Sequence, residues 1–307
     1  MAIPTYERIM LPLLEVLKDN KIYTNNECID ILAKKLNITE EEKNLCFPSG
    51  KKRIFYDRVN WAKTYMKKAG LVEAPRRGTV RITKIGLELL NENPQELKSK
   101  DLLRYDSFYE FVSSSNREEN HNENNGVSLN EKTPSEEIAN AFENLKTSLA
   151  DEILEKINSC SFEFFEKLVI ELLIKMGYGG SREEAGRATR KTGDEGIDGI
   201  INEDRLGLDS IYIQAKRWQD TVVGRPEIQK FSGALDTPGA SKGIFITTST
   251  FSKEARDYVK AINTKNIVLI DGRQLAQYMI EFNVGVSTEI IYEVKKIDTD
   301  YFIEEQY

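Results

Sequence analysis

Apolar positions in the first 40 residues recur at the spacing of amphipathic helices. One helical face carries Ile9, Leu13, Val16 and Leu17. A second apolar run begins at Ile29, and Thr24 and Glu27 precede it with the spacing of a capping box. Pro12 suits only the first turn of a helix, so the first helix is predicted to begin near it.

A third helix and a hairpin are predicted next. The helix runs from about Lys52 to Ala69 and ends at Gly70. Two short strands, Leu71–Glu73 and Thr79–Thr83, flank a turn whose tip carries two arginines. This order of elements is the outline of a winged-helix DNA-binding domain, which we assign to residues 1–92.

Charge is distributed unevenly along the chain. The net charge is −7, yet residues 43–90 contain twelve basic and three acidic side chains. A basic third helix and an arginine-tipped wing would attract phosphate with little dependence on base sequence. A solvated basic face on an ordinary helical domain is the alternative. The residues expected to contact DNA are Lys51, Lys52, Arg53, Arg58, Lys63, Arg76, Arg77 and Arg81, with Arg217 in the second half of the chain.

The chain between residues 93 and 149 is interpreted as a linker. Short helices are predicted at Leu102–Val112 and Ile138–Ile157. Between them, Ser113–Pro134 has almost no apolar side chain, which predicts a disordered stretch. His121, the only histidine, lies in this stretch, so we expect neither a histidine base nor a histidine metal site in the folded regions.

Helical and strand patterns alternate from Ser161 onward. Helices are predicted at Phe162–Met176, Pro226–Leu235, Ser252–Ile262 and from Arg273, and strands at Ile197–Ile201, Ile211–Lys216, Gly243–Thr248 and Ile267–Ile270. This order predicts an α/β domain, a mixed sheet flanked by helices, at residues 150–290, followed by a tail at 291–307. The fold class of the whole chain is therefore a winged helix plus an α/β domain.

Candidate chemistry gathers on the first two strands of this domain. Alternate side chains of a strand share a face, so Gln214 and Lys216 point the same way, and the gap to Asp198 fits a hairpin. Carboxylate and amide oxygens suit a hard ion such as magnesium. Lys216 could position or help deprotonate the attacking water and offset charge growing on a phosphate.

Several neighbouring residues leave alternatives open. Asp194 either contacts a ligand or simply forms the turn beside Gly193. Thr247 and Thr248 either bind phosphate or cap the following helix. Arg217 either contacts phosphate or packs at the sheet edge.

Six ordered blocks of the C-terminal half carry a resemblance to a known family. They are FFEKLVIELLIKMGY at 164–178, GDEGIDG at 193–199, QAKRW at 214–218, GRPEIQKFSGAL at 224–235, KGIFITTSTFSKEAR at 242–256 and VLIDG at 268–272. In these blocks the chain resembles the Mrr family of restriction endonucleases, a QxK variant within the PD-(D/E)xK nuclease superfamily. The N-terminal half resembles the winged-helix domain that precedes this nuclease.

The resemblance implies catalytic positions at Asp198, Gln214 and Lys216, with Glu166 as a supporting carboxylate and metal ligand. Glu163 and Glu171 lie on the same predicted helix and are the alternatives to Glu166. The resemblance also implies magnesium or manganese as cofactor, and cleavage of double-stranded DNA that bears modified, often methylated, bases. A homodimer or higher homo-oligomer is expected, because cutting both strands requires a second copy of the site.

The remaining sequence features narrow the class of protein. No apolar run reaches the length of a membrane span, and the N-terminus lacks the pattern of a signal peptide. The three cysteines have no metal-binding spacing. A cytoplasmic, nucleoid-associated protein is expected. A structure-specific nuclease and a non-cleaving DNA-binding regulator are the alternative functions.

Overall fold

The computed structural model describes residues 3–115, 131–179, 196–203, 208–219, 221–236 and 241–297. The chain divides into two compact units, residues 1–143 and 144–307, and each is described by itself. None of the described helices is long and apolar enough to cross a membrane.

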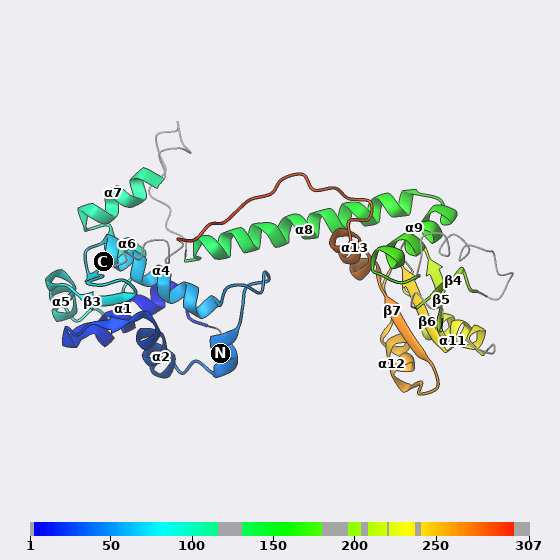
Figure 1. Cartoon of the computed structure of the whole chain (residues 1–307), viewed down its shortest axis with the longest axis horizontal. Helices are drawn as coiled ribbons and strands as arrows, with labels where there is room; N and C mark the ends of the chain where they lie inside the picture. The colour runs from blue at the N-terminus through cyan, green and yellow to red at the C-terminus, as the bar shows by residue number, and fades with distance from the viewer. Residues whose placement is uncertain are drawn as a thin grey trace, which may run out of the picture. The chain divides into compact units, whose positions relative to one another are not determined.

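The N-terminal unit contains helices around a small antiparallel sheet, labelled in Figure 1. Its helices are α1 (Tyr6–Val16), the 3-10 turn η1 (Leu17–Asp19), α2 (Asn25–Lys35), α3 (Glu40–Asn44), α4 (Ile54–Lys68), α5 (Lys84–Asn91), α6 (Ser99–Leu102) and α7 (Asp106–Ser115). Its strands are β1 (Tyr23–Thr24), β2 (Val72–Glu73) and β3 (Thr79–Ile82), in the order β1-β3-β2. The hairpin of β2 and β3 is the predicted wing, and α4 is the predicted third helix.

Local sequence explains how these helices begin. The capping box predicted at Thr24 and Glu27 is confirmed, with the Glu27 N–H donating to Thr24 Oγ1 at 3.2 Å. The prediction for Pro12 is wrong, because this proline lies inside α1. Proline inside a helix costs about 3 kcal/mol. Burial of Tyr6, Ile9 and neighbouring apolar side chains on α1, at roughly 1.5–3 kcal/mol each, offsets that cost.

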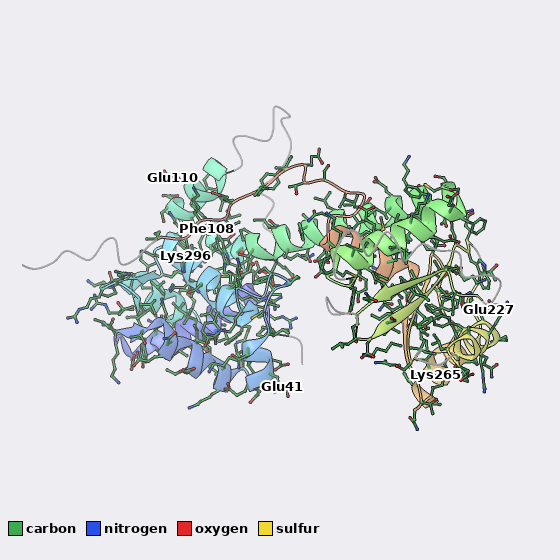
Figure 2. All side chains as sticks on the ribbon, turned by 45° about the vertical axis from the view of Figure 1, so that its right-hand side comes forward. Glu41, Phe108, Glu110, Glu227, Lys265 and Lys296 are labelled. Carbon is green, nitrogen blue, oxygen red and sulfur yellow. The ribbon has the colours of Figure 1, made fainter. Side chains whose placement is uncertain are left out.

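Part of the predicted linker packs onto the N-terminal core. Leu97, Leu102 and Phe108 are buried in the same cluster as the side chains of α1 and α4. Figure 2 shows Phe108 directed inward and Glu110 of the same helix directed outward, in agreement with their burial. The single helix predicted at Leu102–Val112 is instead two helices, α6 and α7, joined by a turn. Most of the predicted disordered stretch, residues 116–130, lies outside the described residues.

Helix α8 (Pro134–Ser159) is continuous across the division between the units. It extends the predicted helix Ile138–Ile157 at both ends. Its last turns join the core of the C-terminal unit through Ala150, Ile153 and Ile157.

The C-terminal unit is a mixed sheet covered by helices on both faces, as predicted. Its remaining helices are α9 (Phe162–Lys175), α11 (Arg225–Ala234), α12 (Lys253–Ala261) and α13 (Gly272–Glu281). Its strands are β4 (Gly199–Asn202), β5 (Ser210–Lys216), β6 (Lys242–Thr247) and β7 (Asn266–Ile270), in the order β4-β5-β6-β7. Strands β4 and β5 are antiparallel, whereas β5, β6 and β7 are parallel.

Alternating strand residues divide the core of this unit into two layers. Ile213, Ile244 and Ile246 pack with α8, α9 and α13 on one face. Phe245 and Tyr212 pack with α11 and α12 on the other. The two layers fix β4 and β5 between helices, and the candidate catalytic side chains lie at one end of this pair.

Candidate active site and DNA-binding surface

Asp198 lies at the residue just before β4 and is held by the backbone of β5. Its N–H donates to the Ile213 carbonyl at 2.8 Å, which continues the β4–β5 ladder. Its Oδ2 accepts from the Ala215 N–H at 2.7 Å. No other hydrogen bond of this carboxylate is made to the described part of the chain.

Gln214 and Lys216 lie opposite Asp198 on β5. The register pairs Gly199 with Ile213, and one further step along it brings Asp198 beside Gln214. Gln214 is 3% exposed, and Lys216 is half-buried two residues further along the same strand face. The structure therefore brings the three residues together at the end of one antiparallel pair.

A glycine turn leads into this site. Gly196 has φ +80°, and a Cβ at this position would lie 3.2 Å from Gln214 Nε2. A side chain here would be strained and would press on the amide of Gln214. The first half of this turn, including Asp194, lies outside the described residues.

Burial raises the pKa of the Asp198 carboxyl, while the Ala215 N–H and the charge of Lys216 act to lower it. The ionised carboxylate is therefore costly in this environment, and a bound cation would offset that cost. With the Gln214 amide beside it, the donor set consists of hard oxygen atoms, which fits a magnesium ion that retains several waters. Within the described ranges, no three His, Cys, Asp or Glu side chains form a metal-binding group by themselves.

Helix α9 carries the candidate supporting carboxylate, Glu166. It packs against the strand face shared by Ile201 and Ile213. Glu166 is half-buried, whereas Glu163 is exposed and paired with Lys167 at 3.0 Å. Glu171 is also exposed. Burial thus favours Glu166 over its two neighbours, although its role stays a prediction.

Two side chains that hold the end of β5 could not be identified from sequence. The Thr247 hydroxyl donates to the Lys216 carbonyl at 2.8 Å, and the Thr248 hydroxyl donates to the Trp218 carbonyl at 2.8 Å. These threonines therefore fix the backbone next to Lys216, and Ser252 caps α12 instead. The only hint in the sequence was their position at the end of a parallel strand.

Arg217 contacts protein on both sides. Its guanidinium donates to the Asn158 carbonyl of α8 and lies 4.4 Å from the ring centroid of Phe162. Its Nε is buried and has no hydrogen-bond partner among the residues that the structure describes. The side chain therefore joins the α8–α9 junction to the end of β5, and its predicted contact with DNA stays untested.

The basic side chains of the N-terminal unit differ in how many hydrogen bonds and ion pairs they already form within the protein. Arg58 donates through Nε to Glu136 at 2.7 Å and also reaches the carbonyls of Ile3 and Pro4. Lys63 donates to Asn25 Oδ1 at 2.7 Å, and burial lowers the pKa of its amine. Both side chains are largely withdrawn from solvent.

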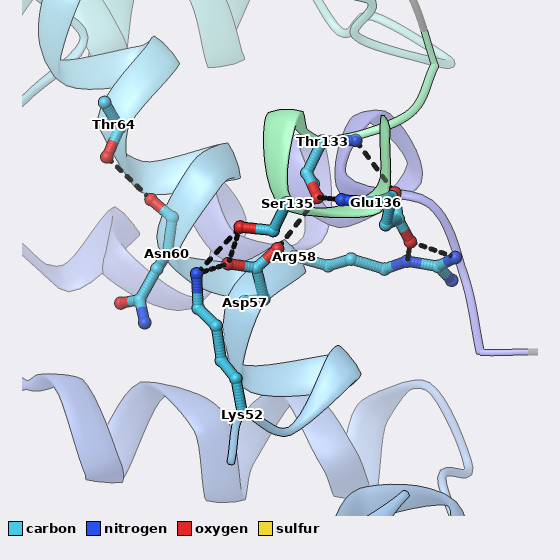
Figure 3. A network of polar contacts seen from close by, with 8 residues as sticks. All are labelled: Lys52, Asp57, Arg58, Asn60, Thr64, Thr133, Ser135 and Glu136. Carbon is cyan, nitrogen blue, oxygen red and sulfur yellow. Dashed lines mark hydrogen bonds and ion pairs between the residues drawn. The ribbon is translucent and has the colours of Figure 1, made fainter. Parts of the chain in front are cut away.

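A second polar group joins α4 to the first turn of α8, as Figure 3 shows. Asp57 is 1% exposed and forms an ion pair with Lys52. Its other oxygen accepts from the Thr133 hydroxyl at 2.8 Å. Lys52 also donates to Ser135 Oγ at 2.9 Å. The contacts of Thr133 with Asp57 and of Ser135 with Lys52 join residues 76 and 83 positions apart, so no local motif could reveal them.

The other basic candidates lie on the surface of the unit. Arg81 pairs with Glu73 across the wing, and Arg53 stacks over Tyr56 at 3.9 Å from the ring centroid. Lys51, Arg76 and Arg77 are exposed, and no side-chain ion pair binds them within the described part of the chain. Lys51 and the two arginines at the wing tip are therefore the candidates most available to a DNA phosphate.

Comparisons with known proteins agree in both units. A family model described as "Restriction endonuclease" (Mrr_cat) matches residues 157–279, and one described as "Mrr N-terminal domain" matches residues 6–92. The type IV methyl-directed restriction enzyme EcoKMrr of Escherichia coli (strain K12) is 34% identical over 314 residues, covering 98% of this chain and 100% of the relative.

Two solved structures match this chain over smaller parts of its length. The DNA modification-dependent restriction endonuclease AspBHI has 17% identity and a TM-score of 0.33, over 46% of this chain and 36% of that chain. The MspJI restriction endonuclease in complex with a 27-mer oligonucleotide has 19% identity and a TM-score of 0.29, over 67% and 49%.

The fold and the family models together define a restriction endonuclease with an N-terminal winged helix. The chain belongs to the Mrr family of restriction endonucleases, to which EcoKMrr also belongs.

Proposed function

We propose that this protein hydrolyses phosphodiester bonds of double-stranded DNA that bears modified bases, with a divalent metal ion as cofactor. The observation that carries the proposal is the meeting of Asp198, Gln214 and Lys216 at the end of β4 and β5. Modification dependence is supported by EcoKMrr, which is named as methyl-directed and matches along its whole length.

Each residue of the site has a distinct proposed role. Asp198 and the Gln214 amide oxygen would hold magnesium or manganese, with Glu166 as a further carboxylate. When bound, the metal ion lowers the pKa of a coordinated water and offsets charge on the phosphate. The Lys216 ammonium would orient the attacking water and stabilise the negative charge that develops on phosphorus-bound oxygen.

The winged helix would supply the electrostatic attraction to DNA. Lys51, Arg76 and Arg77 are exposed, and Arg53 is also exposed and lies over the ring of Tyr56. Contacts of this kind fix position along the duplex and carry little sequence information. Where the winged helix, the linker and the nuclease domain begin and end stays as predicted from sequence, at residues 92/93, 149/150 and 290/291.

Self-association into a homodimer or larger homo-oligomer belongs to the same proposal. Large apolar side chains on α8 support it, because Phe142 and Leu145 are 62% and 71% exposed on one helix face. Exposed apolar side chains on one face are typical of protein interaction sites. Sedimentation of the full chain over a range of concentrations would detect the association.

The proposed activity is tested with plasmids purified from methylating and non-methylating hosts. In the presence of magnesium, we expect loss of the methylated plasmid alone, and EDTA should prevent it. Cleavage of neither plasmid would contradict the nuclease assignment. Equal cleavage of both would contradict the dependence on modification and leave the nuclease assignment intact.

A further inference from the structure

The first turn of α8 covers two cations that a DNA phosphate would need, Arg58 of α4 and Lys52 just before α4. Arg58 uses Nε and a terminal nitrogen on Glu136, at 2.7 and 2.6 Å, and its other terminal nitrogen on backbone carbonyls. Lys52 is shared between Asp57 and Ser135. We propose that the segment Thr133–Glu136 competes with DNA phosphate for Arg58 and Lys52 and is in this sense an internal competitor for DNA on α4. This inference rests on the proposed function, because α4 has to face DNA.

The competition follows from the chemistry of the guanidinium group. A carboxylate and a phosphate bind the same paired N–H groups, so one excludes the other. Glu136 is 8% exposed, and the side chain of Arg58 is 18% exposed. A phosphate therefore cannot reach Arg58 until Glu136 leaves it.

Release of this turn would leave the start of α8 folded. Glu136 accepts from the Thr133 N–H through Oε2 at 2.8 Å and uses Oε1 for Arg58. The Glu136 N–H in turn donates to Thr133 Oγ1 at 3.3 Å. This reciprocal cap is internal to α8, so it survives when the contact with Arg58 is lost.

Asp57 contributes the second half of the contact. Its buried carboxylate accepts from the hydroxyls of Thr133 and Ser135, at 2.8 and 3.3 Å, while neutralising Lys52 (Figure 3). Undocking of α8 exposes this carboxylate to water and removes the Ser135 contact of Lys52. Two cations therefore become available through one movement.

The proposal is tested by DNA binding as a function of salt, in an Asp198→Ala background that separates binding from cleavage. Glu136→Gln and Asp57→Asn keep the shape of each side chain and remove its charge. Each should steepen the salt dependence of log K by about 0.9, equivalent to about five-fold tighter binding at 0.15 M salt. Glu92→Gln is the control, because it removes the same charge from an exposed pair with Arg104.

Hydrogen exchange gives a second readout on the full-length chain. The released turn keeps its cap but loses its packing against α4, so it opens more often, and addition of duplex DNA should accelerate exchange of the amides in the first two turns of α8 in the Asp198→Ala protein. If Glu136→Gln fails to fold, Ser135→Ala carries the test, because it removes the contacts of α8 with Lys52 and Asp57.

The outcomes separate this inference from the proposed function. Two results would overturn the proposed competition. One is a salt dependence of DNA binding in Glu136→Gln and Asp57→Asn that equals that of Glu92→Gln. The other is slower exchange of the α8 amides when duplex DNA is added. Steeper salt dependence in the Asp198→Ala background, combined with no cleavage by the protein that retains Asp198, would support the competitor and contradict the proposed nuclease activity.

Discussion

Truncation of Asp57 to alanine should destabilise the N-terminal unit by about 2–4 kcal/mol. The side chain is 1% exposed, and the Thr133 hydroxyl that donates to it is fully buried. A hydrogen bond to a charged group contributes about 1.5–3 kcal/mol, and the longer Ser135 contact adds less. The Lys52 ion pair adds under about 1 kcal/mol, because the lysine side chain is 51% exposed.

The chain offers a direct assay for this prediction. Its two tryptophans, Trp61 and Trp218, lie in different units. In a Trp218→Phe background, the fluorescence of Trp61 during urea unfolding reports the N-terminal unit alone. Asp57→Asn should cost less than half as much, because the amide oxygen can still accept from Thr133.

A matched control distinguishes burial from charge. Glu92→Ala removes a carboxylate from an exposed pair with Arg104 and should cost under about 1 kcal/mol. An Asp57→Ala variant whose free energy of unfolding equals that of the Glu92→Ala control would refute the reasoning from burial.

Three further predictions follow from burial and close packing. Gly272→Ala should destabilise the C-terminal unit by on the order of 3 kcal/mol, because the new Cβ would lie 2.2 Å from the Thr248 carbonyl oxygen. Trp218 fluorescence during urea unfolding measures the loss. An unchanged free energy of unfolding would mean that these two backbone segments separate easily. Burial raises the pKa of the Cys28 thiol to about 11, so iodoacetamide at pH 8 should alkylate exposed Cys46 and spare Cys28 in native protein, as read by mass spectrometry. Burial lowers the pKa of the Lys63 amine. In the alkaline range below pH 10.5 the unfolded chain therefore keeps a proton on Lys63 that the folded protein has lost. The free energy of unfolding should rise with pH in this range. Lys63→Met should lack this rise, and an identical alkaline slope in the variant would exclude the lysine as its cause.

Periodicity and spacing were sufficient for most of the fold. The positions of the strands along the α/β domain, the wing and the cap at Thr24 all follow from local patterns, whereas the order β4-β5-β6-β7 within the sheet depends on long-range pairing. The position of Pro12 inside α1 does not, because tertiary burial overrides the local preference of proline. The docking of Leu97 and Phe108 onto the first core likewise requires long-range contacts.

The grouping of Asp198, Gln214 and Lys216 was predictable from the sequence, while their catalytic role stays a prediction. Alternation on β5 is enough to put Gln214 and Lys216 on one face. The hydrogen bond from the Ala215 N–H to Asp198, and the threonine contacts that fix the end of β5, depend on cross-strand register. The ion pair between Arg58 and Glu136 could not be predicted either, because a count of charges does not show which cations already have partners.

Cleavage by site variants tests the central claim most directly. Wild type, Asp198→Ala, Lys216→Ala and the control Glu163→Ala, which alters an exposed ion pair on α9, would be compared on a methylated plasmid with magnesium. We expect the Asp198 and Lys216 variants to bind duplex DNA with near wild-type affinity and to cut none of it, while Glu163→Ala cuts normally. Cleavage by either site variant at the wild-type rate would contradict the assignment of this site.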